Sequence, residues 1–389
     1  MLQADIIHYL FINKYLFNMH GRIYIFMVCI GLFMTSGTNK AHAQILEDSN
    51  SLSLVRNEID CIYNLQFKNA NEIYEKIARI YPGHPVLFLL RGLSTYWKNY
   101  PMLITAPARV SFEEDMRHCI RLTEKNRNAA YEAEYLLANL CSRGMLLKFY
   151  SDNNLTLETL PLVTSTYKYL RRSFNFTNAC SDLYYYTGVY NYYREAYPKV
   201  YPAYKPLALL LPHGDMDTGL KQLHTAAVNA VVLRAESYLL LSWIYLNFEN
   251  KYQQALYFSK SLHEMYPDNM SYTVTYIKNL LLMKQYDEAE KLILASAKDA
   301  ENKYFQAQLT IFKGVLQEKK YHDNNLARQY YSSGINGITP FGDYANEFEA
   351  YAYFGLSRIS NAGNEKHMSK KFREKAMRLG DFKKLNFDK

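Results

Sequence analysis

Glycine and proline are scarce in this sequence, with 16 Gly and 11 Pro among 389 residues. A loop-rich all-β protein of this length would need more turn residues, so the shortage disfavours that class. Hydrophobic residues make up 49% of the chain and charged residues 21%, which excludes a disordered or collagen-like protein. The length is about two to three times that of a usual domain and indicates either several domains or one elongated array.

The sequence also lacks the short motifs that mark common enzyme sites. It contains no Gly-x-Ser-x-Gly elbow, no phosphate-binding Walker loop and no dinucleotide glycine fingerprint. The histidines form no His-x-x-x-His pair, and the cysteine spacings match no zinc signature. We therefore expect a protein that is not an enzyme and has no cofactor and no metal. An enzyme whose site is assembled from a central insertion is the alternative.

The N-terminal segment has the three parts of a secretory signal peptide. Arg22 precedes an apolar run over residues 23–34, and an A-x-A cleavage site ends at Ala43. We predict that residues 1–43 are removed, with Met19 as an alternative start. The apolar run is shorter than the roughly 20 residues that span a bilayer, so an uncleaved membrane anchor is the weaker alternative. We expect the mature chain to be periplasmic or associated with the cell envelope.

Positive charge is not concentrated in any part of the sequence. The formal net charge is +8, and loss of residues 1–43 lowers it to +6. The short basic clusters lie among acidic residues and fit a solvated surface better than a nucleic-acid footprint. We therefore expect no nucleic-acid partner, and no segment after the signal peptide is apolar enough to span a membrane.

Four cysteines remain after the predicted cleavage, namely Cys61, Cys119, Cys141 and Cys180. Export to an oxidising compartment permits disulfides, and Cys119 and Cys141 are the best candidate pair because they fall on neighbouring predicted helices. Four separately buried thiols are the favoured alternative, since a free Cys packs like a small apolar side chain.

Two segments of the sequence align without a gap at an offset of 34 residues. Tyr252 corresponds to Tyr286, and Ala255 corresponds to Ala289. A third copy has Phe67, Ala70 and Tyr74, and its Pro82 lies fifteen residues after Phe67, as Pro267 does after Tyr252. This recurrence predicts a helical repeat, with a non-repetitive helical bundle as the alternative.

The period and the residue order resemble the tetratricopeptide repeat. In that family an aromatic residue opens the second helix, Ala follows, and Pro closes the unit. The resemblance implies an all-α fold, a right-handed α-solenoid of seven or eight stacked antiparallel helix pairs in which small residues occupy the helix crossings. The positions that match the repeat are Phe67, Ala70, Tyr74, Pro82, Gly92, Gly188, Gly219, Tyr252, Ala255, Pro267, Tyr286 and Ala289.

The middle of the chain departs from the repeat and is rich in tyrosine. We predict repeats over residues 44–196 and 216–389, separated by a Pro-, Tyr- and Leu-rich insertion over residues 197–215. Asp215 is the predicted N-cap of the helix that follows. The Gly-x-Tyr-x-Tyr-Tyr helix and its apolar loop resemble a group of exported tetratricopeptide-repeat proteins of the Bacteroidetes type, a resemblance that supplies no activity.

The central tyrosines have two interpretations. Tyrosine buries a large ring while its hydroxyl stays at a wet edge, so the rings can simply pack between helices. Rigid aromatic rings are also favoured in recognition, and the concave face of a solenoid binds extended ligands. The candidate partner-binding residues are Tyr186, Tyr190, Tyr193, Tyr197, Tyr201 and Tyr204.

The leading functional hypothesis is an exported scaffold that mediates protein–protein contacts. Its expected partners are unknown proteins, including extended peptide segments bound along the concave face. The alternative is a protein that binds carbohydrate or a peptidoglycan fragment, with the tyrosine rings stacked on sugar faces. The oligomeric state does not follow from the sequence.

The repeat register predicts which substitutions destabilise the chain. Ala289→Trp should overpack a helix crossing and lower the free energy of unfolding by about 1 to 3 kcal/mol. Lys291→Ala, on the exposed face of the same helix, should change little. Chemical denaturation of both variants checks this, and equal effects would contradict the register.

Overall fold

The computed structural model describes residues 45, 48–125, 128–299, 302–379 and 387. All regular structure in this part of the chain is helical, and it contains no strand. The predicted signal peptide over residues 1–43, together with Met19, lies outside the described residues.

Consecutive helices pack as pairs along the chain, and each pair contacts the next. The first four pairs are α2 (Ser49–Tyr63) with α3 (Phe67–Ile80), α4 (Pro85–Lys98) with α5 (Ala108–Lys125), α6 (Glu132–Asp152) with α7 (Thr156–Ser173), and α8 (Leu183–Val200) with α10 (Met216–Asn229). The last four are α11 (Arg234–Asn247) with α12 (Tyr252–Met265), α13 (Met270–Leu282) with α14 (Tyr286–Asp299), α15 (Lys303–Leu316) with α16 (Asn324–Ile338), and α17 (Asn346–Ala362) with α18 (Lys366–Arg378). The short elements are η2 (Ala129–Tyr131), η3 (Pro202–Tyr204), α9 (Lys205–Ala208), the π-turn η4 (Gln317–Tyr321) and η5 (Thr339–Ala345).

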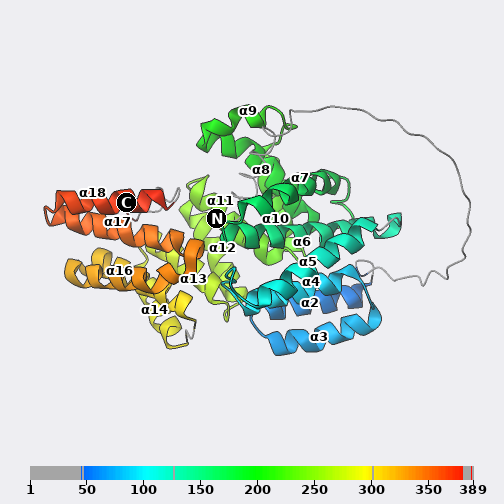
Figure 1. The fold of residues 1–389 in the computed structure, drawn as a ribbon, viewed down its shortest axis with the longest axis horizontal. Coiled ribbons are helices and arrows are strands. Elements are labelled where there is room, and N and C mark those ends of the chain that lie inside the picture. Colours follow the sequence, from blue (N-terminus) through cyan, green and yellow to red (C-terminus); the bar gives the residue numbers. More distant parts are fainter. Residues whose placement is uncertain (1–44, 46–47, 126–127, 300–301, 380–386, 388–389) are drawn as a thin grey trace, which may run out of the picture.

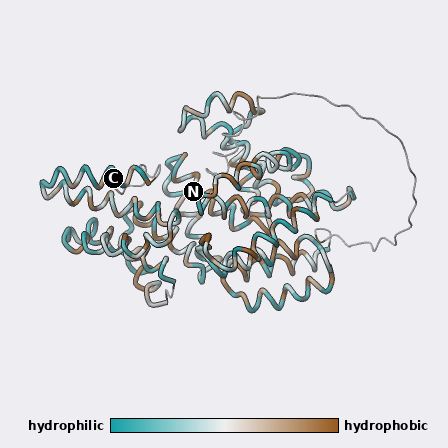
Figure 2. Tube along the Cα trace, in the orientation of Figure 1, coloured by the Kyte–Doolittle hydropathy of each residue, from teal (hydrophilic) through white to brown (hydrophobic). Residues whose placement is uncertain are grey.

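The pairs follow one another along an elongated molecule (Figure 1). The blue to green N-terminal pairs lie at one end of the long axis, the orange and red pairs lie at the other, and α11 to α13 lie between them. Hydrophobic and hydrophilic residues alternate along the helices, as expected for helices that bury one face (Figure 2). This helix-pair packing is consistent with a helical repeat.

The predicted helix ends are confirmed where the sequence carries an explicit signal. The second helices α3 and α12 end at Ile80 and Met265, two residues before Pro82 and Pro267. Proline ends them because it lacks a backbone donor and disfavours helical geometry in the preceding residue. Asp215 caps α10, since its carboxylate accepts a hydrogen bond from the Thr218 backbone N–H at 2.7 Å.

Small residues occupy the helix crossings. Ala255 and Ala289 are fully buried on α12 and α14. The backbones of α8 and α10 meet at two glycines: a Cβ on Gly188 would lie 2.9 Å from the Gly219 carbonyl oxygen, and a Cβ on Gly219 would lie 2.5 Å from the Tyr192 nitrogen. Only glycine permits this approach.

The insertion begins later than predicted. Helix α8 runs through Pro198 to Val200, and only then does the chain turn into η3 and α9. The ring of Tyr197 packs against those of Tyr201 and Tyr204, with centroid distances of 4.6 and 5.1 Å. These contacts offset the backbone hydrogen bond that Pro198 cannot donate.

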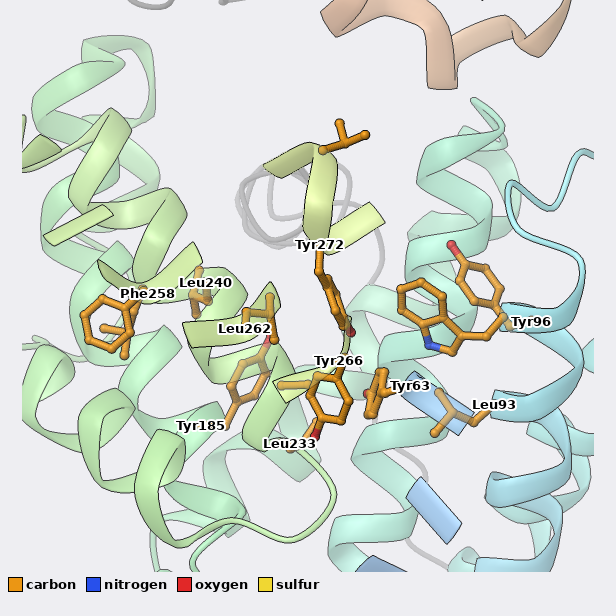
Figure 3. Close-up of a cluster of buried hydrophobic side chains, with 14 of the residues drawn as sticks. Tyr63, Leu93, Tyr96, Tyr185, Leu233, Leu240, Phe258, Leu262, Tyr266 and Tyr272 are labelled. Carbon is orange, nitrogen blue, oxygen red and sulfur yellow. The ribbon is translucent and has the colours of Figure 1, made fainter. Parts of the chain in front are cut away.

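The array turns back on itself, so that α2 and α4 contact helices roughly 200 residues later in the chain. Figure 3 shows Tyr63 beside Tyr266 and Tyr272, and the Tyr63 ring lies 5.7 Å from those of Trp97 and Tyr266. The Asn269 amide also donates a hydrogen bond of 2.7 Å to the Tyr63 carbonyl. We call this contact between the first and sixth pairs the closing interface.

Polar bonds extend the closing interface in both directions. Asp60 accepts hydrogen bonds from Arg234 at 2.8 Å and from the Tyr266 hydroxyl at 2.7 Å. On the loop after α4, the Tyr100 carbonyl accepts a hydrogen bond of 2.9 Å from the Asn302 amide. The N-terminal pairs are therefore joined to the fifth, sixth and seventh pairs.

The glycine contact between α8 and α10 gives a stability test. Gly219→Ala forces the two backbones apart and should cost about 1 to 3 kcal/mol of unfolding free energy. Gly144→Ala is the matched control inside α6, where a new Cβ meets only the Tyr186 hydroxyl at 3.7 Å. Because Ala forms helix better than Gly, this control should be neutral or stabilising by about 0.5 to 1 kcal/mol. Thermal unfolding that ranks the two variants the other way would contradict the crossing.

Candidate ligand-binding cavity

A cavity of about 210 Å³ lies where the first helices of six pairs face one another. Side chains from α4, α6, α11, α13, α15 and α17 line it, together with residues of η5 and the loop after α4. Second helices of the pairs contribute no lining residue among those described. The cavity exists because the closing interface brings the N-terminal pairs against the later ones.

Aromatic rings form much of the cavity wall. Both tryptophans of the chain, Trp97 and Trp243, line it. Tyr100, Tyr304 and Tyr344 lie nearby and contact one another, with centroid distances of 5.8 to 6.2 Å. Large aromatic faces of this kind bind apolar bodies, sugar rings and organic cations.

Charged side chains are set among these rings in two ion pairs. The Lys148 ammonium lies 3.0 Å from the Asp152 carboxylate, and the Lys278 ammonium lies 2.8 Å from that of Glu347. Burial acts to lower the pKa of Lys148, but Asp152 outweighs it and the pKa is raised. Burial likewise acts to raise the pKa of Glu347, and Lys278 holds it below its usual value. Lys148 and Glu347 are therefore both charged at neutral pH.

Two further carboxylates line the cavity outside these pairs, Glu236 and Asp343. Glu236 accepts a hydrogen bond of 3.2 Å from the Tyr63 hydroxyl, and Asp343 accepts one of 3.2 Å from the Asn346 amide. Neither lies within ion-pair distance of a cationic side chain in the part of the chain that the structure describes. Burial raises the pKa of Glu236, although nearby Lys148 opposes the shift.

The wall also carries buried polar atoms without partners. Gln308 is 2% exposed, and its side-chain oxygen accepts no hydrogen bond from any described residue. The Trp243 indole N–H is likewise buried without an acceptor among the described residues. Buried polar groups are normally satisfied, so these two atoms offer one acceptor and one donor to whatever occupies the cavity, water or a ligand.

A second, mainly apolar cavity of about 100 Å³ lies on the other side of Glu236. Its lining includes Leu89, Met145 and Val189, and it shares Lys148 and Glu236 with the first cavity. These two charged side chains therefore stand between a polar cavity and an apolar one.

The six tyrosines that the sequence proposes for binding lie elsewhere. Tyr190, Tyr193 and Tyr197 are at most 6% exposed, and the Tyr190 hydroxyl donates a hydrogen bond of 2.7 Å to the Pro212 carbonyl. Tyr186, Tyr201 and Tyr204 are half-buried. None of the six lines the first cavity, and Tyr186 lines the second. Their role in partner binding stays a prediction.

Sequence reasoning missed the charged residues of the cavity. They come from helices spread over some 200 residues, so no local motif joins them. Two carried a usable signal, because Glu236 and Lys278 interrupt otherwise apolar helix stretches. A charged residue in a buried helix face needs a partner and often marks a functional site.

The four cysteines in the part of the chain that the structure describes are free thiols. Cys119 and Cys141, the candidate pair, are buried and not joined by a disulfide, and Cys180 is also buried. Burial raises the pKa of Cys119 to about 12, so its thiol is protonated and unreactive at neutral pH. Separate burial, the favoured alternative, fits these three, whereas Cys61 is only partly buried.

The described residues offer neither a clustered metal site nor a membrane-spanning helix. They contain no group of three or more His, Cys, Asp or Glu side chains placed to hold a metal ion. They also contain no helix of the length and apolarity that a bilayer crossing requires.

Comparison with protein-family models finds no match, and comparison with curated proteins finds none either. The chemistry of the cavity is therefore the basis for assigning a function.

One buried carboxyl outside the cavity makes stability depend on pH. Glu58 on α2 is 1% exposed, one of its oxygens has no hydrogen-bond partner among the described residues, and burial raises its pKa to about 8. In the unfolded chain the pKa is near 4.5, so between these values the folded state holds a proton that the unfolded state has lost. The resulting stability is complete below pH 4.5 and is lost as the pH rises to about 8.

Glu58→Gln should remove this dependence because the amide does not titrate. In the wild type, the Glu58 carboxyl makes the unfolding free energy lower at pH 8 than at pH 5. We expect Glu58→Gln to remove this loss, which is on the order of 1 to 3 kcal/mol. Urea denaturation at the two pH values measures the difference. The matched control is Glu72→Gln, an exposed site on α3. A pH profile unchanged by Glu58→Gln would contradict the buried carboxyl.

Proposed function

We propose that this chain is an exported, non-enzymatic scaffold of the cell envelope, a right-handed tetratricopeptide-type array that binds part of a partner protein in its central cavity. The observation that carries the proposal is the convergence of both tryptophans and two ion pairs from the first helices of six pairs on one cavity. Trp97 also packs on Tyr63 and Tyr272 in the closing interface, so Trp243 and the two ion pairs are the members of this set that most favour a ligand.

The size of the cavity favours a chain end or a protruding side chain over a folded surface. A volume of about 210 Å³ holds one large side chain or a short stretch of extended peptide. In such a complex the aromatic rings supply affinity as anchors, and the ion pairs around them select among ligands by charge.

Binding without chemistry fits the state of the two lysines. An amine acts as a nucleophile only when it is deprotonated, and Lys148 has a raised pKa and a carboxylate partner. Lys278 is held by Glu347 in the same way. Paired in this manner, both serve better as fixed charges than as reacting groups.

A second candidate function is the binding of a carbohydrate or a peptidoglycan fragment. Trp97 and Trp243 favour it, because indole faces stack on sugar rings, and the carboxylates and Gln308 are suitable acceptors for hydroxyl groups. This candidate requires no protein partner.

Site-specific cross-linking in intact cells tests the proposal. A photo-reactive amino acid replaces Trp243 in the cavity or, as the control, Tyr257, which is 62% exposed on α12. We expect a protein adduct, identified by mass spectrometry, from position 243 and not from 257. Equal labelling at both positions would contradict the proposal. Saturable binding of purified peptidoglycan fragments, without a protein adduct, would establish the second candidate instead.

A further inference from the structure

We infer that the central cavity binds an organic cation, a protonated amine carried on an apolar or aromatic body. The inference rests on the proposed function and names the chemistry of the group that enters the site. A chain end, a basic side chain or a free amine would present the same group.

The charge balance of the cavity carries the first step. Four carboxylates line it, from Asp152, Glu236, Asp343 and Glu347, against two ammonium groups. The chain as a whole has a formal net charge of +8, so the cavity is acidic within a basic protein. Glu236 and Asp343 are partly buried and have no ion-pair partner among the described residues, and a cationic ligand would supply one.

The state of the two lysines argues against an anionic ligand. Each ammonium already lies within 3.0 Å of a carboxylate, and an anion would have to displace that partner. It would also face Glu236 and Asp343, which have no ion-pair partner among the described residues. A cation meets neither obstacle.

Hydrogen-bonding capacity points the same way. An ammonium group has three donors and no acceptor. Glu236 receives one described hydrogen bond, from Tyr63, and retains unused acceptor capacity, while the buried Gln308 oxygen receives none from the described residues. Together with the four carboxylates, these acceptors outnumber the one unused donor described at the wall, the Trp243 indole N–H, so the cavity suits a ligand rich in N–H donors.

The walls suit the body that carries the amine. Lys278 already places its ammonium 5.8 Å from the centroid of the Trp243 ring, so these aromatic faces accept cations. The apolar second cavity begins at Glu236, which allows an apolar group to pack on one side while the ammonium meets the carboxylate. A volume of about 210 Å³ accommodates a ring with a short chain, since about 150 Å³ suffices for benzene.

Calorimetric titration at pH 7.5 with three nearly isosteric probes tests the inference. The probes are 2-phenylethylamine, the neutral 2-phenylethanol and the anionic 3-phenylpropionate. We expect the amine to bind at least tenfold more tightly than the alcohol and the acid not to bind. The dipeptide Phe-Ala, with a free or an acetylated N-terminus, distinguishes a peptide chain end from a free amine. If the dipeptide with the free N-terminus binds and the acetylated form does not, the cavity accepts a chain end.

Two matched variants locate the binding. Glu236→Gln keeps the shape and removes the charge, and we expect it to reduce amine affinity at least tenfold while binding of the alcohol is unchanged. Glu374→Gln, an exposed site on α18, should leave both unchanged. Thermal unfolding of each variant confirms that it is folded. A second binding-site variant, Trp243→Phe, keeps a ring but removes the indole, and we expect it to weaken amine binding.

The inference is overturned if amine and alcohol bind equally, if the acid binds best, if no probe binds, or if Glu236→Gln leaves amine affinity unchanged. A different result, the absence of a protein adduct at position 243, would contradict the proposed function. Amine binding without a protein adduct at position 243 would support the organic-cation ligand and contradict the protein-binding function. A protein adduct without amine binding would support the protein-binding function and contradict the organic-cation ligand.

Discussion

The contact between the first and sixth helix pairs is the constraint on which the rest of the structure depends. The Asn269 amide donates a hydrogen bond of 2.7 Å to the Tyr63 carbonyl. The rings of Tyr63, Trp97, Tyr266 and Tyr272 pack around this hydrogen bond. An open array of helix pairs would leave its first helices facing a broad groove. Closure makes them face one another and turns part of that groove into a cavity, so stability and the candidate site share the same residues.

The cavity also explains why the fold tolerates charges in its interior. Taking Lys278 and Glu347 out of water costs free energy that their 2.8 Å pairing offsets, and in proteins such buried pairs are often no more stable than well-packed apolar residues of similar size. The same holds for Glu236, whose pKa is raised by burial. Sites that break local rules in this way are typically functional, which is why the cavity outweighs the tyrosine-rich helix α8 in the functional argument.

The sequence predicted those features that local physics determines. The 34-residue offset predicted helix pairs, Pro82 and Pro267 predicted helix ends, and Asp215 predicted an N-cap, because each acts on its immediate neighbours. Helix α8 continued past Pro198 because packing of Tyr197 outweighed a local preference. The cavity could not be predicted, because Lys148, Glu236 and Glu347 meet only after the chain has closed, and no local pattern encodes closure.

Closure can be measured directly by cross-linking a pair of introduced cysteines. The exposed side chains of Gln66 and Asp268 lie 3.4 Å apart across the closing interface, although 202 positions separate them in the chain. In a variant with Cys61 replaced by Ser, a short bifunctional thiol reagent should join the Gln66→Cys and Asp268→Cys pair rapidly within the monomer, whereas it should not join Gln66→Cys with Lys291→Cys. Failure of the first pair to cross-link, or equal rates for both pairs, would contradict a closed array and the cavity that it creates.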